Sequence, residues 1–126
     1  MTSHSQVFGK EAEVAAEQNL RRQGYRILGR NVRFSNGELD IVAKKDDTIV
    51  FVEVKARRTD QFGGASYAVT PRKQQRLIHL AAQYLAQHQL SQSLSRFDVM
   101  LYQNGAGGRL EHVVNAFEVA GDDHRW

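Results

Sequence analysis

The sequence predicts an α/β domain in which helices flank a mixed five-stranded sheet, with the element order α-βββ-α-β-β. Three β-rich runs separated by turn dipeptides follow an amphipathic helix, as in an antiparallel meander. A second helix separates the third run from the fourth, which implies a crossover and one parallel pair of strands. With 126 residues, of which 25% are charged, the chain has the size and composition of one ordinary globular domain.

Turn and helix-end residues divide the chain into these elements. Gly24 ends a first helix over about residues 7–23, where apolar side chains recur at helical spacing. Thr70 as N-cap and Pro71 at the first helical position begin a second helix, which extends to about Gln89. Strands are expected at 25–34, 38–45, 48–57, 96–103 and 109–119, in one domain covering 1–126 with its core at about 7–119 and loose ends at 1–6 and 120–126.

Composition excludes several classes of site. The chain contains no Cys, which removes disulfides, thiolate zinc sites and cysteine nucleophiles. No apolar run approaches the ~18 residues of a membrane span, and the first residues lack the apolar stretch of a secretory signal, so we expect a cytoplasmic protein without membrane contact. A formal net charge of +3 is compatible with a polyanionic partner without requiring one.

The second and third predicted strands bring acidic side chains together. If the dipeptide at 46–47 forms the turn, Asp40 lies opposite Glu53, and Glu38 lies opposite Lys55. Because side chains alternate along a strand, all four project from one face of the sheet. The other face is then filled by Leu39, Ile41, Ala43, Val50, Val52 and Val54.

Two carboxylates opposed across a ladder repel each other, so we expect a cation beside Asp40 and Glu53. Lys55 supplies part of this charge, and a divalent cation such as Mg²⁺, which prefers oxygen ligands, supplies more. Glu13 lies on the flank of the first helix's apolar stripe, from which it is able to reach the sheet. On spacing alone the other interpretation stays open: Glu38 and Lys55 form an ordinary cross-strand ion pair and the acids are solvated.

Two further features are expected to be structural. Asp98, within the run at 96–99, is expected to make a structural hydrogen bond or ion pair. The five His are scattered and form no pair at metal-binding spacing, so the sequence predicts no zinc hydrolase site.

An ordered set of motifs spans residues 9–119. It comprises Gly9 with Glu13, the run at 24–28, Asn31, the run Gly37-Glu38-Leu39-Asp40-Ile41-Val42, the run Phe51-Val52-Glu53-Val54-Lys55 followed by Arg57, Lys73, and the run at 96–99. In this order the motifs resemble the YraN family, which is similar to Holliday-junction resolvases and belongs to the restriction-endonuclease-like, PD-(D/E)xK superfamily. The resemblance implies a restriction-endonuclease-like fold. One departure is Leu39, which stands where the superfamily has a proline that offers no ligand.

The resemblance also implies a cofactor and roles for individual residues. Asp40, Glu53 and the Val54 carbonyl would bind Mg²⁺ or Mn²⁺, and Glu13 would join them directly or through water. Lys55 would orient the attacking water and offset charge on the phosphate. Such a site suits phosphodiester hydrolysis, which needs an activated water and stabilised negative charge. The expected catalytic set is therefore Glu13, Asp40, Glu53 and Lys55.

Five cations follow the third predicted strand or open the second helix. Cations in the first turn of a helix oppose its macrodipole unless an anion joins them, and phosphate would fit there. Ordinary solubilising charge is the alternative for Arg58 and Arg76. The residues expected to bind nucleic acid are Arg57, Arg58, Arg72, Lys73 and Arg76.

The function expected is that of a metal-dependent endonuclease acting on DNA, with branched or damaged DNA as substrates suggested by the resolvase analogy. One alternative is a nucleic-acid-binding module that keeps the fold without cleaving, and another is a protein-interaction scaffold. Acids facing a polyanion favour the enzyme, because without a metal they would repel phosphate. Resolvase-like proteins pair as dimers, so a homodimer is the assembly to test for.

Overall fold

The computed structural model describes residues 4–57, 69–103 and 108–118. The described chain has the predicted order of elements, α-βββ-α-β-β. No helix in these residues has the length and hydropathy of a membrane-spanning segment. The elements are α1 His4–Arg22, β1 Arg26–Phe34, β2 Gly37–Lys45, β3 Thr48–Arg57, α2 Pro71–Gln87, β4 Leu94–Gln103 and β5 Arg109–Phe117.

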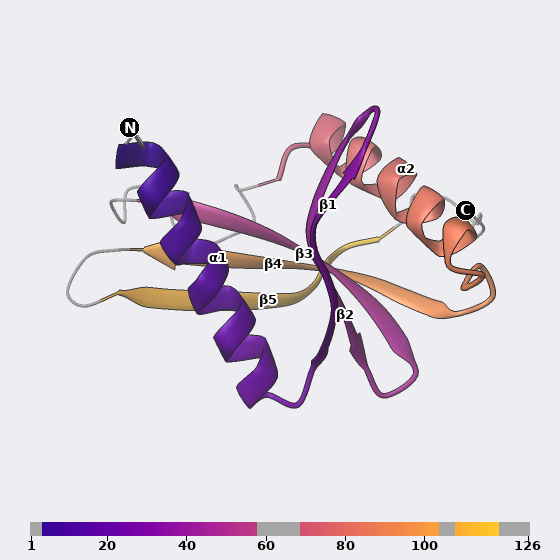
Figure 1. Cartoon of the computed structure of the whole chain (residues 1–126), viewed down its shortest axis with the longest axis horizontal. Coiled ribbons are helices and arrows are strands. Elements are labelled where there is room, and N and C mark those ends of the chain that lie inside the picture. The colour runs from indigo at the N-terminus through magenta and orange to yellow at the C-terminus, as the bar shows by residue number, and fades with distance from the viewer. Residues whose placement is uncertain (1–3, 58–68, 104–107, 119–126) are drawn as a thin grey trace.

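The strands form one mixed sheet in which spatial order follows chain order, from β1 to β5 (Figure 1). β3 and β4 pair in parallel, and the other neighbours pair antiparallel. α2 makes the connection between the two parallel strands, as the sequence predicted. The α/β class and the mixed five-stranded sheet are thereby confirmed.

Each helix packs on its own face of the sheet and closes a separate apolar core (Figure 1). α2 covers the larger core, where its leucines meet the aromatic rings of Phe51 and Phe97. α1 covers the smaller core with Ala16 and Leu20, above Met100 of β4. Residues of β2 and β3 supply both cores alternately, so these two strands lie between the layers and are held from both sides.

The helix ends follow the local signals in the sequence. Gly24 adopts a left-handed conformation with φ +90°, and the N–H of Tyr25 donates to the Leu20 carbonyl at 2.9 Å, which closes α1 in a Schellman motif. At the start of α2 the Thr70 hydroxyl accepts a hydrogen bond from the Lys73 N–H at 3.2 Å. This cap fixes the first turn of α2, on which Lys73 lies.

Several expected boundaries differ from the structure by one to three residues, and β5, expected to reach residue 119, ends at Phe117. α1 begins at His4 and not near residue 7, so residues 4–6, expected to be loose, are helical. α2 ends at Gln87, two residues early. β4 begins at Leu94, because pairing with the start of β3 extends it backwards. The rest of the expected loose ends, 1–3 and 120–126, lies outside the described residues.

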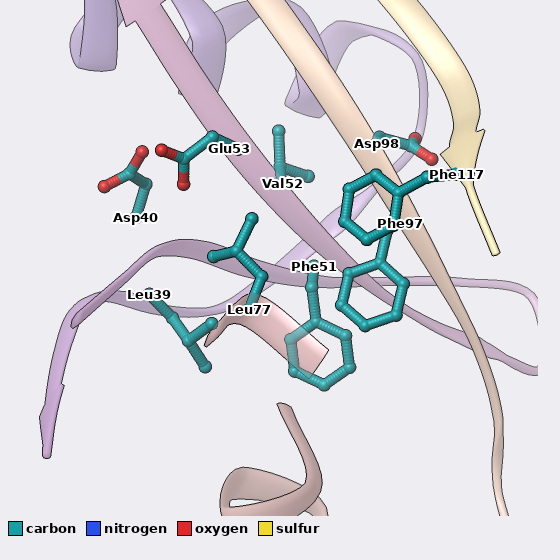
Figure 2. A pocket seen from close by; sticks show the side chains of 9 residues that line it. All are labelled: Leu39, Asp40, Phe51, Val52, Glu53, Leu77, Phe97, Asp98 and Phe117. Atoms are coloured by element: carbon teal, nitrogen blue, oxygen red, sulfur yellow. The ribbon is translucent and has the colours of Figure 1, made fainter. Parts of the chain in front are cut away.

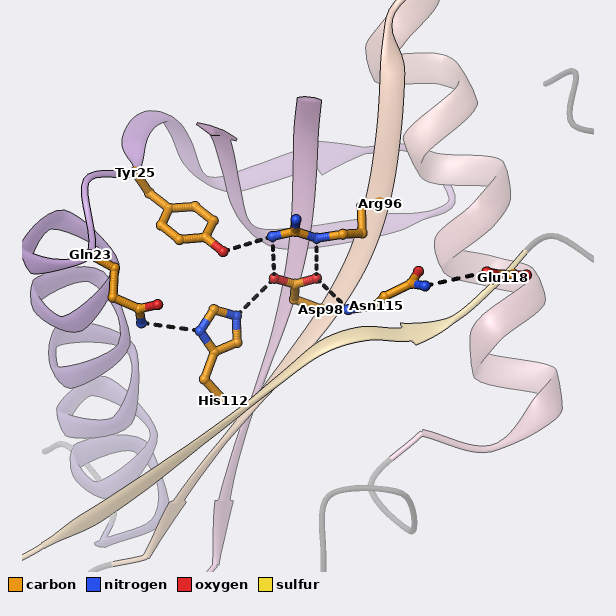
Figure 3. A network of polar contacts seen from close by, with 7 residues as sticks. All are labelled: Gln23, Tyr25, Arg96, Asp98, His112, Asn115 and Glu118. Atoms are coloured by element: carbon orange, nitrogen blue, oxygen red, sulfur yellow. Dashed lines mark hydrogen bonds and ion pairs between the residues drawn. The ribbon is translucent and has the colours of Figure 1, made fainter. Parts of the chain in front are cut away.

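A buried polar network ties β4 to β5 and to the end of α1 (Figure 3). The Asp98 carboxylate has no exposed surface and accepts two hydrogen bonds from the Arg96 guanidinium, at 2.9 and 3.0 Å. His112 contacts the same carboxylate at 2.8 Å, and the Asn115 N–H donates to it at 2.9 Å. Arg96 also donates to the Tyr25 hydroxyl at 2.7 Å. The structural role expected for Asp98 is thus confirmed.

Charge and hydrogen bonding decide the ionisation of this carboxyl. Burial alone would raise the pKa of Asp98, but the hydrogen bonds from His112, Arg96 and Asn115 outweigh it and hold the pKa below its ordinary value. Asp98 also lies where the β4–β5 register shifts. The Asp98 side chain therefore supplies the acceptor for the backbone N–H of Asn115, which the irregular ladder leaves without a backbone acceptor.

Candidate active site

The site is built where β2 and β3 stop pairing. Their antiparallel ladder runs from Lys45 opposite Thr48 to Ile41 opposite Val52, which is the register expected from a two-residue turn. Beyond this pair the Asp40 carboxylate accepts a hydrogen bond from the backbone N–H of Val54 at 2.8 Å. A side chain thus takes the place of a backbone acceptor, and the two strands separate around it.

The separation changes which side chains share a face. Leu39, expected on the face of Ile41, packs instead in the core under α2 together with Val42. That part of the prediction is wrong, because regular alternation stops at the point where the ladder ends. Asp40 consequently borders a pocket on each face. The pocket under α2 includes Leu39, Phe51, Glu53 and Leu77, and the pocket beside α1 includes Lys10, Glu13, Glu17, Arg30 and Asn31.

Asp40 and Glu53 come together as the register predicted, with their carboxyl groups adjacent (Figure 2). The Glu53 side chain is only 8% exposed. Burial, the negative charge of Glu53 and a hydrogen bond to that residue raise the pKa of Asp40 to about 7, although the Val54 N–H opposes the shift. Two acids held this close cannot both be charged without cost unless a cation joins them.

Two lysines supply positive charge at this pair. Lys73, from the first turn of α2, places its ammonium 2.7 Å from a Glu53 oxygen. Burial opposes the charge of Lys73, but the contact with Glu53 outweighs it and raises the pKa. Lys55 lies two residues after Glu53 on β3, and burial together with the nearby Lys73 lowers its pKa. The sequence predicted Lys55 here, whereas the contact of Lys73 with Glu53 had no signal, because spacing along a helix does not fix where its first turn docks.

Glu13 approaches from α1 and is joined to the sheet by an amide. With the Asn31 amide nitrogen facing the carboxylates, it donates to Glu13 at 3.1 Å and to Glu38 at 3.0 Å. Glu38 also pairs with Arg33 of β1 at 3.2 Å. Glu38 thus pairs with Arg33 and not with Lys55, the partner that one of the two open interpretations gave it, because the β1–β2 ladder sets Arg33 directly opposite Glu38. The negative charge of Glu13 contributes to the raised pKa of Asp40.

The five expected nucleic-acid-binding cations are not all placed alike. Arg72 and Arg76 are exposed on α2. Lys73, between them, turns into the acidic pair. Arg57 ends β3, where only the backbone is described, and Arg58 lies outside the described residues.

The donor set fits a hard divalent cation better than a soft one. Carboxylate oxygens of Asp40 and Glu53 and the Val54 carbonyl are the ligand types that Mg²⁺ and Mn²⁺ accept, with water completing the shell. Among the described residues no group of three or more His, Asp or Glu side chains is arranged to hold a metal ion. The protein therefore offers two carboxylates, with Glu13 one step further away behind Asn31.

Comparison with known proteins shows a family. The chain matches the uncharacterised protein family UPF0102 over residues 12–101. A UPF0102 protein of Pelobacter propionicus is 46% identical over 89% of this chain and 83% of its own length. One from Desulfosudis oleivorans is 40% identical over 94% of this chain and 95% of its own length, and one from Symbiobacterium thermophilum is 44% identical over 90% and 98%. The chain therefore belongs to the uncharacterised family UPF0102, the family also known as YraN to which its motifs pointed.

Proposed function

We propose that this protein is a metal-dependent nuclease of the restriction-endonuclease-like superfamily, which hydrolyses phosphodiester bonds in DNA with Mg²⁺ or Mn²⁺. The observation that carries the proposal is the pair of Asp40 and Glu53, held together where β2 and β3 separate, with two lysines beside it. A purely structural site has no need for two adjacent acids whose burial and mutual repulsion raise the pKa of one of them, Asp40, to about 7. Branched or damaged DNA is the substrate class that the likeness to resolvases suggests.

Each residue has a physical task in this proposal. Asp40, Glu53 and the Val54 carbonyl would hold the cation, whose chemistry is to lower the pKa of a water and offset phosphate charge. The Val54 N–H orients the Asp40 carboxylate. Lys55, whose pKa is lowered, holds the attacking water and stabilises charge on the phosphate. Glu13, fixed by Asn31, orders water on the α1 side of the pair.

A panel of DNA structures tests the proposal. Wild-type protein with Mn²⁺ is expected to cleave at least one of linear, nicked, flapped and four-way DNA, and Lys55→Ala is expected to reduce the rate by about a hundredfold or more. Lys44→Ala removes an exposed lysine from β2 and is the matched control, expected to cleave at the wild-type rate. If wild-type protein binds DNA but leaves every substrate intact, the protein is a non-catalytic nucleic-acid-binding module instead.

The raised pKa of Asp40 predicts how metal affinity depends on pH. Below about pH 7 this carboxyl holds a proton that a cation must displace, so Mn²⁺ binding is expected to strengthen as pH rises through 7 and to release a proton. Calorimetric titration at pH 6 and pH 8, in buffers of different ionisation enthalpy, measures both effects. An affinity that is the same at both pH values would show that Asp40 is not a ligand.

A further inference from the structure

The contact between Lys73 and Glu53 places one cation where another is proposed to bind. The Lys73 ammonium lies 2.7 Å from Glu53 Oε1, and the two side chains are 29% and 8% exposed. The Thr70 cap and Pro71 set the conformation of the first turn of α2, which carries Lys73. The Lys73 side chain is a four-carbon stem with several rotatable bonds, so its ammonium can change partner without any movement of the helix backbone.

Electrostatics explains why a lysine stands at this place. A buried carboxylate without a partner is costly, and here a second acid, Asp40, lies beside it. The Lys73 ammonium stabilises the pair as long as no divalent cation is bound there. A divalent cation on the same Glu53 oxygens would repel the ammonium at close range, so the two cations exclude each other from that position.

We propose that Lys73 is an exchangeable counter-ion of Glu53, which leaves the carboxylate when a divalent cation binds and then contacts a phosphate of the bound DNA. The inference rests on the proposed function and deepens it, because it assigns Lys73 a task different from that of Lys55. Arg72 and Arg76 also carry a positive charge near the start of α2, but they are exposed. They therefore serve as comparisons for the loss of a charge that does not contact Glu53.

Metal affinity is the first test. At pH 8, Lys73→Met is expected to tighten Mn²⁺ binding by about tenfold, because the cation no longer competes with an ammonium. Arg72→Met removes a charge from the same helical turn and is expected to change the affinity by less than about threefold, because exposed charges are screened. Lys73→Gln serves the same purpose if Lys73→Met does not fold.

The salt dependence of DNA binding is the second test. With Ca²⁺, used to support binding without turnover, Lys73→Met is expected to reduce the slope of log affinity against log salt concentration by about one. In EDTA the ammonium is held by Glu53, so the same substitution is expected to leave the slope unchanged. A constant phosphate contact would instead reduce the slope equally in both conditions.

The outcomes separate this inference from the proposed function. If wild-type protein binds Mn²⁺ and cleaves DNA, but Lys73→Met binds Mn²⁺ no more tightly than Arg72→Met, the counter-ion exchange is wrong and the nuclease stands. Weaker Mn²⁺ binding by Lys73→Met would also overturn the exchange, because Lys73 would then help to hold the site. If wild-type protein neither binds Mn²⁺ nor cleaves, the proposed function itself is wrong.

Discussion

The substitution Asp40→Asn is expected to lower the rate of DNA cleavage by about a thousandfold while leaving the fold intact. An Asn oxygen still accepts the hydrogen bond from the Val54 N–H, but a neutral amide no longer attracts a divalent cation, and such a cation contributes several kcal/mol to the transition state. Single-turnover cleavage at saturating Mn²⁺ measures the effect. Undiminished cleavage would remove Asp40 from the site.

The same substitution is expected to stabilise the protein at neutral and alkaline pH. The folded pKa of Asp40 is raised to about 7. Stability is therefore greatest below the unfolded pKa of this carboxyl, where it is protonated in both states, and is lost as pH rises through 7. Asp40→Asn removes this loss and should increase the free energy of unfolding at pH 8 by about 2 kcal/mol, with less change at pH 5. Urea unfolding in EDTA at both pH values measures it.

Asp47→Asn makes the same chemical change in the exposed turn after β2. It is expected to change neither the rate of DNA cleavage nor the free energy of unfolding. A gain in stability together with a loss of activity would show that the two adjacent acids are kept for function although their repulsion lowers the stability of the fold. If Asp40→Asn destabilises the protein at pH 8, the carboxylate is a structural partner of Val54 and its repulsion with Glu53 is unimportant.

The substitution Asp98→Ala is expected to cause the largest loss of stability, about 3–5 kcal/mol. It leaves the Arg96 guanidinium, the His112 ring and the Asn115 N–H without the acceptor they share. Urea unfolding at pH 7 measures the loss. The contribution of Asp98 is present above its unfolded pKa and disappears as pH falls through its lowered folded value.

Two further variants serve as comparisons for Asp98→Ala. Asp98→Asn keeps one acceptor oxygen and the shape of the side chain, so it should lose less stability than Asp98→Ala. Glu11→Ala, on the exposed side of α1, is expected to change the free energy of unfolding by less than about 0.5 kcal/mol. A loss from Asp98→Ala no greater than from Glu11→Ala would mean that the network contributes nothing.

The sequence contained enough information for the architecture because its signals are local. Thr70, Pro71 and Gly24 act on their immediate neighbours, and each marks a helix end correctly. The two-residue turn likewise set the register that brings Asp40 to Glu53. Where long-range pairing decides an element, as at the start of β4, the expected boundary was two residues late.

The arrangement inside the site depends on contacts that no spacing encodes. Glu38 pairs with Arg33, which lies opposite it on β1, and the ladder between β2 and β3 ends before it reaches Glu38. The side of Leu39 changes for the same reason. Lys73 reaches Glu53 because of the angle at which α2 docks, which packing of the core determines.

The parallel pairing of β3 with β4 has a consequence for the order in which the molecule assembles. Thr48 pairs with Leu94 and Arg57 with Gln103, so every residue pair between these strands closes an equally long loop of chain. The pairs within the β1–β2–β3 meander close only short loops. The meander is therefore expected to form first during folding, with β4 arriving later. Asp40 and Glu53 then meet in an early hairpin, before α2 brings the ammonium that relieves their repulsion, so docking of α2 and β4 is favoured by the very charges that the site uses.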